Sequence, residues 1–219
     1  MIGLVIKDFL ILRKTLRTYV LVFVIYVGLA LAGVWAAEFV GGMMMVMTAV
    51  LPMNIFAYDK QAKWDTYALA LPVGRTKTVA ARYLCVLLLC LFSFALIAAL
   101  GFTMSVLGRF EDIDAYETYL VSCAVCGLVG MLVAAFMVPL MYKFGPERAR
   151  LFLYGLGGLI VAGAILFFKV FGGVEWLESL GEPTPAQIAA VPFIAAIAGL
   201  ALLALSFLLS RHFYGQKDV

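Results

Sequence analysis

The chain has 219 residues, of which 65% are hydrophobic and only 13% are charged. A soluble domain carries about 25% charged residues, which keep its surface in solution. This composition excludes a soluble globular enzyme, and its hydrophobicity excludes a disordered chain. The formal net charge is +3, and no basic stripe interleaves with aromatic residues, so we expect no nucleic-acid partner. We expect an integral membrane protein.

The first 17 residues form a basic, amphipathic stretch ahead of an apolar run. Such a stretch predicts a short helix in the cytoplasmic membrane interface, where its basic residues would meet anionic lipid head groups. A basic flank that only sets the topology is the alternative. The charged residues of this candidate membrane-interface segment are Lys7, Asp8, Arg13, Lys14 and Arg17.

Six apolar runs are each long enough to cross a bilayer core of about 30 Å as a helix. The first run is longer than the core of a signal peptide, so we expect it to be retained as a span. None of the runs alternates as the strands of a membrane β-barrel do. We predict an all-α integral membrane protein that forms one domain over residues 1–219. Its six predicted transmembrane helices are residues 18–37, 40–58, 79–106, 119–142, 151–170 and 188–210.

The distribution of charge between the loops predicts the orientation. The N-terminus, the segments 59–82 and 143–150 and the C-terminal tail together hold 14 of the 16 Lys and Arg residues. The other loops hold 8 of the 13 acidic residues. Because Lys and Arg are retained on the cytoplasmic side, we expect both termini in the cytoplasm.

The second span carries a group of methionines followed by a proline. Flexible methionine side chains suit an adaptable apolar binding surface. We therefore treat Met43, Met44, Met47 and Pro52 as a candidate substrate path. The alternative is that these residues pack against other helices or face lipid.

The loop between the second and third spans has the pattern of a short helix with a defined end. Asp59 is placed to cap its N-terminus, and Pro72 forces the preceding residue out of helical geometry. The residues around Pro72 fit a type I turn. One face of this helix would present Trp64, Tyr67, Ala68 and Leu71, which are spaced i, i+3, i+4 and i+7.

Three cations accompany these apolar and aromatic residues: Lys60, Lys63 and Arg75. A loop that only joined two spans would not need aromatic and cationic groups on one helix. The combination predicts a docking surface for a partner protein, with aromatic anchors and complementary charges. An interfacial helix without a partner is the alternative.

The spans lack residues that most transport or catalytic chemistry needs. No ionisable residue lies at the centre of a span, which argues against a proton-coupled carrier. No phosphate-binding loop, hydrolase motif or metalloprotease motif occurs, and we expect no metal site. Cys123 and Cys126 lie within a span, where two small packing residues are favoured over a redox centre. Any ATP-driven work must use another polypeptide.

Motifs at both ends of the chain and in the loop fit one pattern. They are Lys7-Asp8-Phe9, Arg13-Lys14, Tyr58-Asp59, Lys63-Trp64, Tyr67-Ala68, Leu71-Pro72, Arg75, Ser210-Arg211 and Phe213-Tyr214. This pattern resembles the small ABC-2 type permeases of bacterial ABC transporters and extends over essentially the whole chain. In one departure, residues 171–187 leave little room for the membrane-inserted hairpin of larger exporters.

The resemblance implies a permease half that pairs with a second permease copy, as a homodimer or a heterodimer, in the lipid membrane. Two separate ABC ATPase subunits would bind ATP and Mg²⁺, and this chain would bind no cofactor itself. The location would be the bacterial cytoplasmic (inner) membrane. Because the family mostly exports peptides, antibiotics and lipids, the expected substrate is amphipathic or hydrophobic.

Residue by residue, the stretch from Asp59 to Leu71 matches the coupling helix that docks into a groove on the ATPase. Trp64 and Leu71 would be its apolar anchors, and the three cations would meet acidic residues on the ATPase. Two other functions stay open at this point. One is a stand-alone membrane carrier or channel, and the other is a non-transporting membrane anchor or sensor subunit.

Overall fold

The computed structural model describes residues 2–70, 74–108, 113–171 and 185–216, and its regular structure over these residues is entirely helical. Five of the helices are long and apolar enough to cross a membrane, which confirms an all-α protein with several spans. In chain order the helices are α1 (Ile2–Leu31), α2 (Ala37–Gln61), α3 (Trp64–Ala70), α4 (Arg75–Val106), α5 (Ile113–Phe171) and α7 (Pro185–Gly215).

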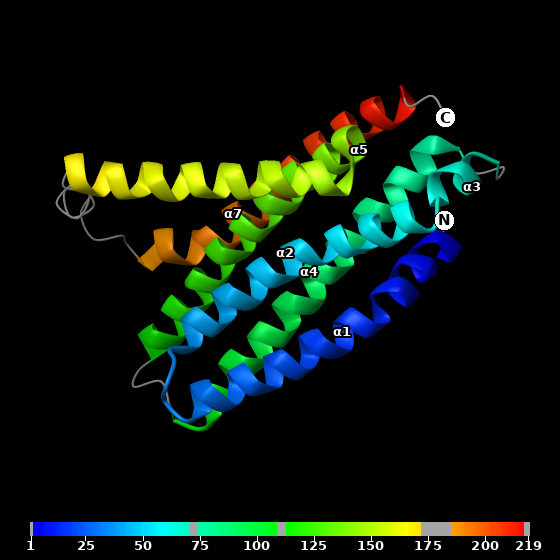
Figure 1. The fold of residues 1–219 in the computed structure, drawn as a ribbon. Coiled ribbons are helices and arrows are strands. Elements are labelled where there is room, and N and C mark those ends of the chain that lie inside the picture. The colour runs from blue at the N-terminus through cyan, green and yellow to red at the C-terminus, as the bar shows by residue number, and fades with distance from the viewer. Residues whose placement is uncertain (1, 71–73, 109–112, 172–184, 217–219) are drawn as a thin grey trace.

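The long helices form a bundle with one distinctive end. α1, α2, α4 and the first part of α5 run side by side, and α7 packs against α5 (Figure 1). The N- and C-termini, α3 and the sharp bend in α5 all lie at the same end of the bundle (Figure 1). These are the segments in which the sequence concentrates Lys and Arg, and we call this end of the molecule the basic end.

The structure corrects the prediction of a separate interface helix before the first span. α1 continues without a break from Ile2 to Leu31. Thirty residues of helix extend about 45 Å, which exceeds a bilayer core of about 30 Å, so about a third of the length of α1 is more than the core needs. Asp8 is only 3% exposed because it faces Arg82 of α4, and this inward contact keeps the start of α1 against the bundle.

The predicted fourth and fifth spans are two parts of α5. They meet at Gly145, whose φ of 79° is a left-handed conformation that glycine adopts without strain. Pro146 follows and cannot donate a backbone hydrogen bond, which favours a bend here. After the bend, α5 leaves the bundle at a wide angle (Figure 1). Its membrane-spanning candidate ends at Gly155, so the fifth span over residues 151–170 stays a prediction.

Hydroxyl groups buried among apolar side chains bond to one another across the helices. The Tyr19 hydroxyl of α1 lies 2.6 Å from Thr48 Oγ1 of α2 and 3.0 Å from Ser93 Oγ of α4. Tyr83 of α4 makes a similar pair of contacts with Ser206 and Ser210 of α7, at 2.5 and 2.7 Å. Unpaired hydroxyls are costly in an apolar interior, so these contacts fix which faces of the helices meet.

Two glycines of α2 explain the pair of cysteines in α5. A β-carbon on Gly41 would lie 3.0 Å from Cys123 Sγ, and one on Gly42 would lie 3.0 Å from Cys126 Sγ. The sulfur atoms therefore occupy the space that the missing side chains leave, and both cysteines are free. This geometry agrees with small packing residues rather than with a redox centre.

Gly101 of α4 provides a similar close approach for an aromatic ring. A β-carbon at this position would overlap the ring of Tyr119, whose hydroxyl donates to the Ile97 carbonyl oxygen at 2.7 Å. Tyr119 is fully buried, so its ring has little freedom to move aside. The absence of a side chain at residue 101 thus allows α4 and α5 to pack together.

Substituting Gly101→Ala should destabilise the folded protein by about 1–3 kcal/mol, because the added methyl group overpacks a rigid contact. Gly28→Ala in α1 is the matched control, since a β-carbon added there would have no other atom within 4 Å. The control should be neutral or slightly stabilising, because alanine favours helix over glycine. Thermal unfolding in detergent measures both. Equal melting temperatures for the two variants would contradict the packing assigned to Tyr119.

Candidate functional site

Four charged side chains are packed between helices at the basic end: Lys7, Asp8, Asp59 and Arg82. We call them the ion cluster. Arg82 donates from Nη2 to Asp59 Oδ2, and its Nη1 lies 3.3 Å from Asp8 Oδ2. Lys7 Nζ lies 2.8 Å from Asp59 Oδ1 and 3.3 Å from Asp8 Oδ1. Arg82, Asp8 and Asp59 are each less than 9% exposed, and the four formal charges sum to zero.

The ion cluster joins three long helices that are distant in sequence. Lys7 and Asp8 come from α1, Asp59 from the last turn of α2, and Arg82 from the third turn of α4. Removing an ion from water costs several kcal/mol, so a buried charge persists only where opposite charges and hydrogen bonds compensate it. The cluster therefore fixes the relative positions of the ends of α1, α2 and α4.

The structure corrects the role predicted for Asp59. Asp59 does not cap the short helix, because α2 continues to Gln61 and the carboxylate is already bound by Arg82 and Lys7. The chain turns instead at Lys63, whose positive φ of 50° ends the run of α2. The short helix α3 therefore begins at Trp64 and not at Asp59.

Trp64 holds α3 against the ion cluster. The Lys7 ammonium lies 4.0 Å from the centre of the Trp64 ring, within the range of a cation–π contact. Ala68 lies one turn further along α3 and is 5% exposed, whereas Tyr67 is 69% exposed. The residues predicted to share one face of α3 therefore do not all point the same way, because successive residues, such as Tyr67 and Ala68, project about 100° apart around a helix. Trp64 and Ala68 face the bundle, and Tyr67 faces outward.

Aromatic rings extend this connection to α5 and α7. The Arg82 guanidinium lies 4.6 Å from the centre of the Phe56 ring. Phe56 in turn packs edge-on against Tyr142 of α5, with ring centres 5.0 Å apart. Tyr142 packs against Tyr214 of α7 at 5.2 Å. The position of α3 is thus linked through Trp64, the ion cluster and these rings to every long helix.

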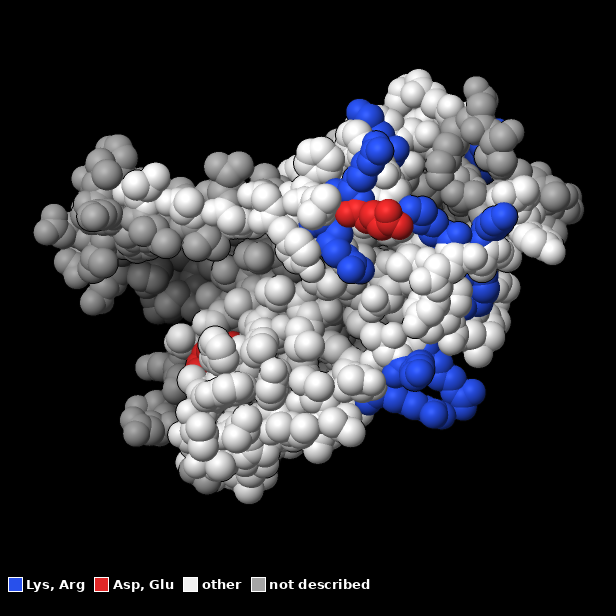
Figure 2. Space-filling view, viewed as in Figure 1, with Lys and Arg blue, Asp and Glu red and all other residues white. Residues whose placement is uncertain are grey.

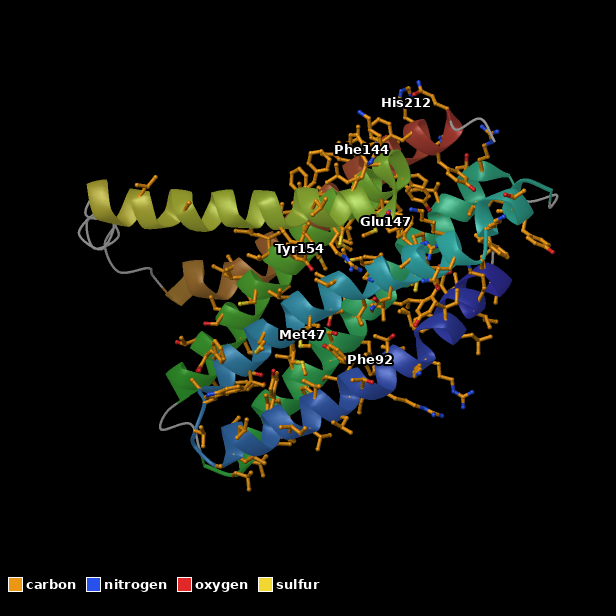
Figure 3. All side chains as sticks on the ribbon, in the orientation of Figure 1. Met47, Phe92, Phe144, Glu147, Tyr154 and His212 are labelled. Atoms are coloured by element: carbon orange, nitrogen blue, oxygen red, sulfur yellow. The ribbon has the colours of Figure 1, made fainter. Side chains whose placement is uncertain are left out.

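Two exposed contacts also bridge helices at the basic end. Lys60 Nζ lies 2.8 Å from Glu147 Oε1, just after the bend of α5 (Figure 3). Arg75 Nη1 donates to the Gly215 carbonyl oxygen at 2.7 Å. The hydrogen bond and the charge of Lys60 lower the pKa of the Glu147 carboxyl group, which lies between the predicted spans. Such solvent-exposed pairs add little stability, so they can break and form at low cost.

The predicted site residues differ in how far they are buried. Those exposed at the basic end are Lys60, Lys63, Tyr67 and Arg75, whereas Asp59 is buried and Trp64 is half-buried. Leu71 and Pro72 lie outside the described residues. On α1, Lys7 and Asp8 belong to the ion cluster, whereas Arg13, Lys14 and Arg17 are exposed.

The methionines of α2 do not share one surface. Met44 is fully buried, Met43 is half-buried and Met47 is 36% exposed, midway along the helix (Figure 3). Pro52 is buried. A substrate path along these four residues stays a prediction.

The sequence did not single out Arg82, which contacts both buried acids of the ion cluster. It counts there only among the Lys and Arg residues of segment 59–82. The available signal was that one arginine and two acids, Asp8 and Asp59, flank three different spans at similar depth. A buried charge of this kind usually has a partner of opposite sign.

The comparison with protein families decides the class of the chain. The family model described as ABC-2 family transporter protein matches residues 3–215. This chain belongs to the ABC-2 transporter family. It is therefore a multi-pass membrane permease of the ABC transporter class, and the family implies association with an ABC ATPase rather than ATPase activity of its own. No curated protein and no solved structure matches the chain.

Figure 2 shows how charge is distributed over this ABC-2 permease. Lys and Arg gather around the basic end, where a small acidic patch lies among them, while the remainder of the visible face is largely uncharged (Figure 2). The ion cluster and α3 thus lie at the end of the molecule that carries most of the positive charge.

Substituting Arg82→Met should destabilise the permease by about 3–5 kcal/mol, because Asp8 and Asp59 would then face Lys7 alone. The double variant Arg82→Met with Asp59→Asn restores a neutral cluster and should recover part of this loss. Melting can be followed by the reaction of a thiol dye with the buried Cys85 and Cys90. Lys60→Met, in an exposed pair, is the control and should have little effect. A double variant no more stable than Arg82→Met would contradict the role assigned to charge balance.

Proposed function

We propose that this ABC-2 family chain is the transmembrane permease subunit of an ATP-driven exporter in the bacterial cytoplasmic membrane. Both termini and α3 would lie in the cytoplasm, and the helix after the bend of α5 would supply the fifth of six spans. The support is the excess of Lys and Arg at the basic end, because loops rich in these residues are generally retained on the cytoplasmic side. ATP and Mg²⁺ would be bound by separate ATPase subunits.

The observation that carries this proposal is the way α3 is anchored. Trp64 and Ala68 face the bundle, so α3 is held from its inner side. Tyr67 is 69% exposed, and Lys60, Lys63 and Arg75 are exposed around it. An aromatic side chain surrounded by cations is suited to an acidic groove on an ATPase. We assign α3 the role of coupling helix, with Tyr67 rather than Trp64 as its outward anchor.

The ion cluster gives α3 a mechanical path into the membrane. A displacement of α3 would act on Lys7 through the Trp64 ring, and on Asp59 and Arg82 through the charges that bind Lys7. Because these contacts are buried, they resist separation, and α1, α2 and α4 would move together at their cytoplasmic ends. The exposed pairs Lys60–Glu147 and Arg75–Gly215 are weaker and can yield during such a movement.

The nature of the bundle limits the class of substrate. Among the described residues, the buried polar groups away from the ion cluster are hydroxyls that are bonded to one another. A charged substrate would find no compensating charge there. We therefore propose an amphipathic or hydrophobic substrate, such as a peptide, an antibiotic or a lipid. A second permease copy, identical or homologous, would complete the translocation path.

Substituting Tyr67→Ala should reduce the amount of ATPase that co-purifies with the tagged permease by about tenfold, because a central aromatic anchor contributes about 1–2 kcal/mol or more. Tyr154→Ala is the matched control, since Tyr154 is similarly exposed but lies on α5 after the bend (Figure 3). A mild-detergent pull-down read by mass spectrometry measures both variants. Retention of the ATPase by Tyr67→Ala would oppose the docking assignment. Absence of any ATPase with the unaltered chain would instead favour a stand-alone carrier or an anchor.

The proposed orientation predicts which residues a membrane-impermeant maleimide can reach in intact cells. Val34→Cys, at the end opposite to α3, should be labelled from outside because residue 34 is 62% exposed. Lys63→Cys should be labelled only after the membrane is permeabilised. The native cysteines are buried or half-buried, so they provide a low background. Labelling of both positions from the same side would rule out the proposed topology.

A further inference from the structure

A cavity of about 270 Å³ lies at the basic end, next to the ion cluster. Its walls come from α2, α3, α4, α5 and α7, and it lies beside the bend of α5 at Gly145. The polar side chains that line it belong to Asp59, Lys60, Trp64, Thr78, Arg82, Tyr142 and Tyr214. The volume would hold about nine water molecules at roughly 30 Å³ each, so it exceeds the space of a single bridging water.

Several hydrogen-bond donors that line this cavity lack a partner. Among the described residues, no acceptor lies within hydrogen-bond geometry of Trp64 Nε1, Arg82 Nε or the Tyr142 hydroxyl, and Arg82 Nη1 has only its ion-pair contact with Asp8 Oδ2 at 3.3 Å. Arg82 and Tyr142 are 4% and 6% exposed, so bulk water does not readily satisfy them. An unpaired buried donor costs about 1–3 kcal/mol, which makes three such atoms in one place unusual for a native protein.

The nearby acceptors are already used. Both oxygens of Asp59 are bound, one by Arg82 and the other by Lys7, and Glu147 is bound by Lys60. Two of the three unpaired atoms, Trp64 Nε1 and Arg82 Nε, carry only N–H groups and cannot accept a hydrogen bond. The cavity therefore has an excess of donors, and the ligand that fits it is one that brings several acceptor atoms.

The directions of the donors and the charge of the surroundings further limit the class of ligand that fits the cavity. The donors come from three helices, α3, α4 and α5, and thus approach the cavity from different directions. A tetrahedral oxyanion can accept hydrogen bonds from several directions at once. The ion cluster is itself neutral, but the basic end as a whole has a large excess of Lys and Arg over acidic residues, which favours an anion.

We propose that this cavity is a binding site for a phosphate group, held by Trp64 Nε1, Arg82 and the Tyr142 hydroxyl. The group would lie beside the coupling helix, between it and the bend of α5. It could belong to the head group of an anionic lipid in the cytoplasmic leaflet or to a soluble phosphate ester, since both offer the same oxygens. The site is formed by this chain's own residues and does not depend on the ATPase proposed above.

Binding can be measured on the full chain in a neutral detergent without nucleotide, so the result is independent of ATPase coupling. The probes are dioleoyl phosphatidic acid, glycerol 3-phosphate and, as a phosphate-free lipid, dioleoylglycerol. Native mass spectrometry measures lipid binding, and equilibrium dialysis measures the soluble ester. Saturable binding of either phosphate-bearing probe, with none of dioleoylglycerol, is the expected result. Binding of phosphatidic acid alone would identify a lipid site, and binding of both would identify a site open to soluble esters.

Two conservative variants test the assigned contacts without disrupting the fold. Trp64→Phe keeps a ring for Lys7 but removes Nε1, and Tyr142→Phe keeps the ring contacts but removes the hydroxyl. Each should weaken phosphate binding about tenfold, as expected for loss of one hydrogen bond to a charged group. Trp35→Phe is the matched control, because Trp35 packs against Tyr26 and Phe39 at the opposite end and should bind as the unaltered chain does.

Two results would overturn the proposal. One is the absence of saturable binding for both phosphate-bearing probes, which would mean that the cavity holds water only. The other is unchanged affinity in both Trp64→Phe and Tyr142→Phe, which would place any bound phosphate elsewhere on the basic end.

Discussion

The compensation of one buried arginine organises the basic end of this permease. Arg82 lies on α4 and finds its counter-charges on α1 and α2, so burying it requires three helices to meet in one arrangement. Lys7 then balances the second acid and places its ammonium over Trp64, which positions α3. Such a cluster adds less to stability than its short distances suggest, because desolvation offsets the attraction. What it supplies is a defined geometry at the point where α3 meets the bundle.

The interior of the bundle is stabilised in a different way. Apolar side chains fill most of the space, small residues allow close approach, and hydroxyl groups of Tyr, Thr and Ser bond across α1, α2, α4 and α7. These contacts specify which helix faces meet, yet they hold no ion. The molecule therefore separates two tasks: ionic contacts fix the position of α3, and neutral contacts align the spans within the hydrocarbon.

Much of this arrangement could be predicted from the sequence, because it follows from hydrophobic length and from the alternation of charge between loops. Such local rules predict the helical class and the short helix between α2 and α4. They also predict that this short helix lies on the same side of the protein as the two termini. The inward orientation of Trp64 and the burial of Asp59 could not be predicted, because they depend on Lys7 and Arg82, which are 18 to 57 residues away along the chain. Periodicity identifies one face of a helix but not which neighbour covers it. The continuous α1 was missed for the same reason, since Asp8 is paired with Arg82 of α4 as well as with its neighbour Lys7.

The separation of ions from hydroxyls has an electrical consequence. A membrane potential does work on a protein only when charge moves through the field, at about 2.3 kcal/mol per elementary charge for each 100 mV. The charged side chains that the structure describes as buried, Asp8, Asp59 and Arg82, are all at the basic end and are mutually neutralised. Rearrangement of the hydroxyl-bonded interior would carry no formal charge across the hydrocarbon. Voltage is therefore a poor source of energy for moving these helices.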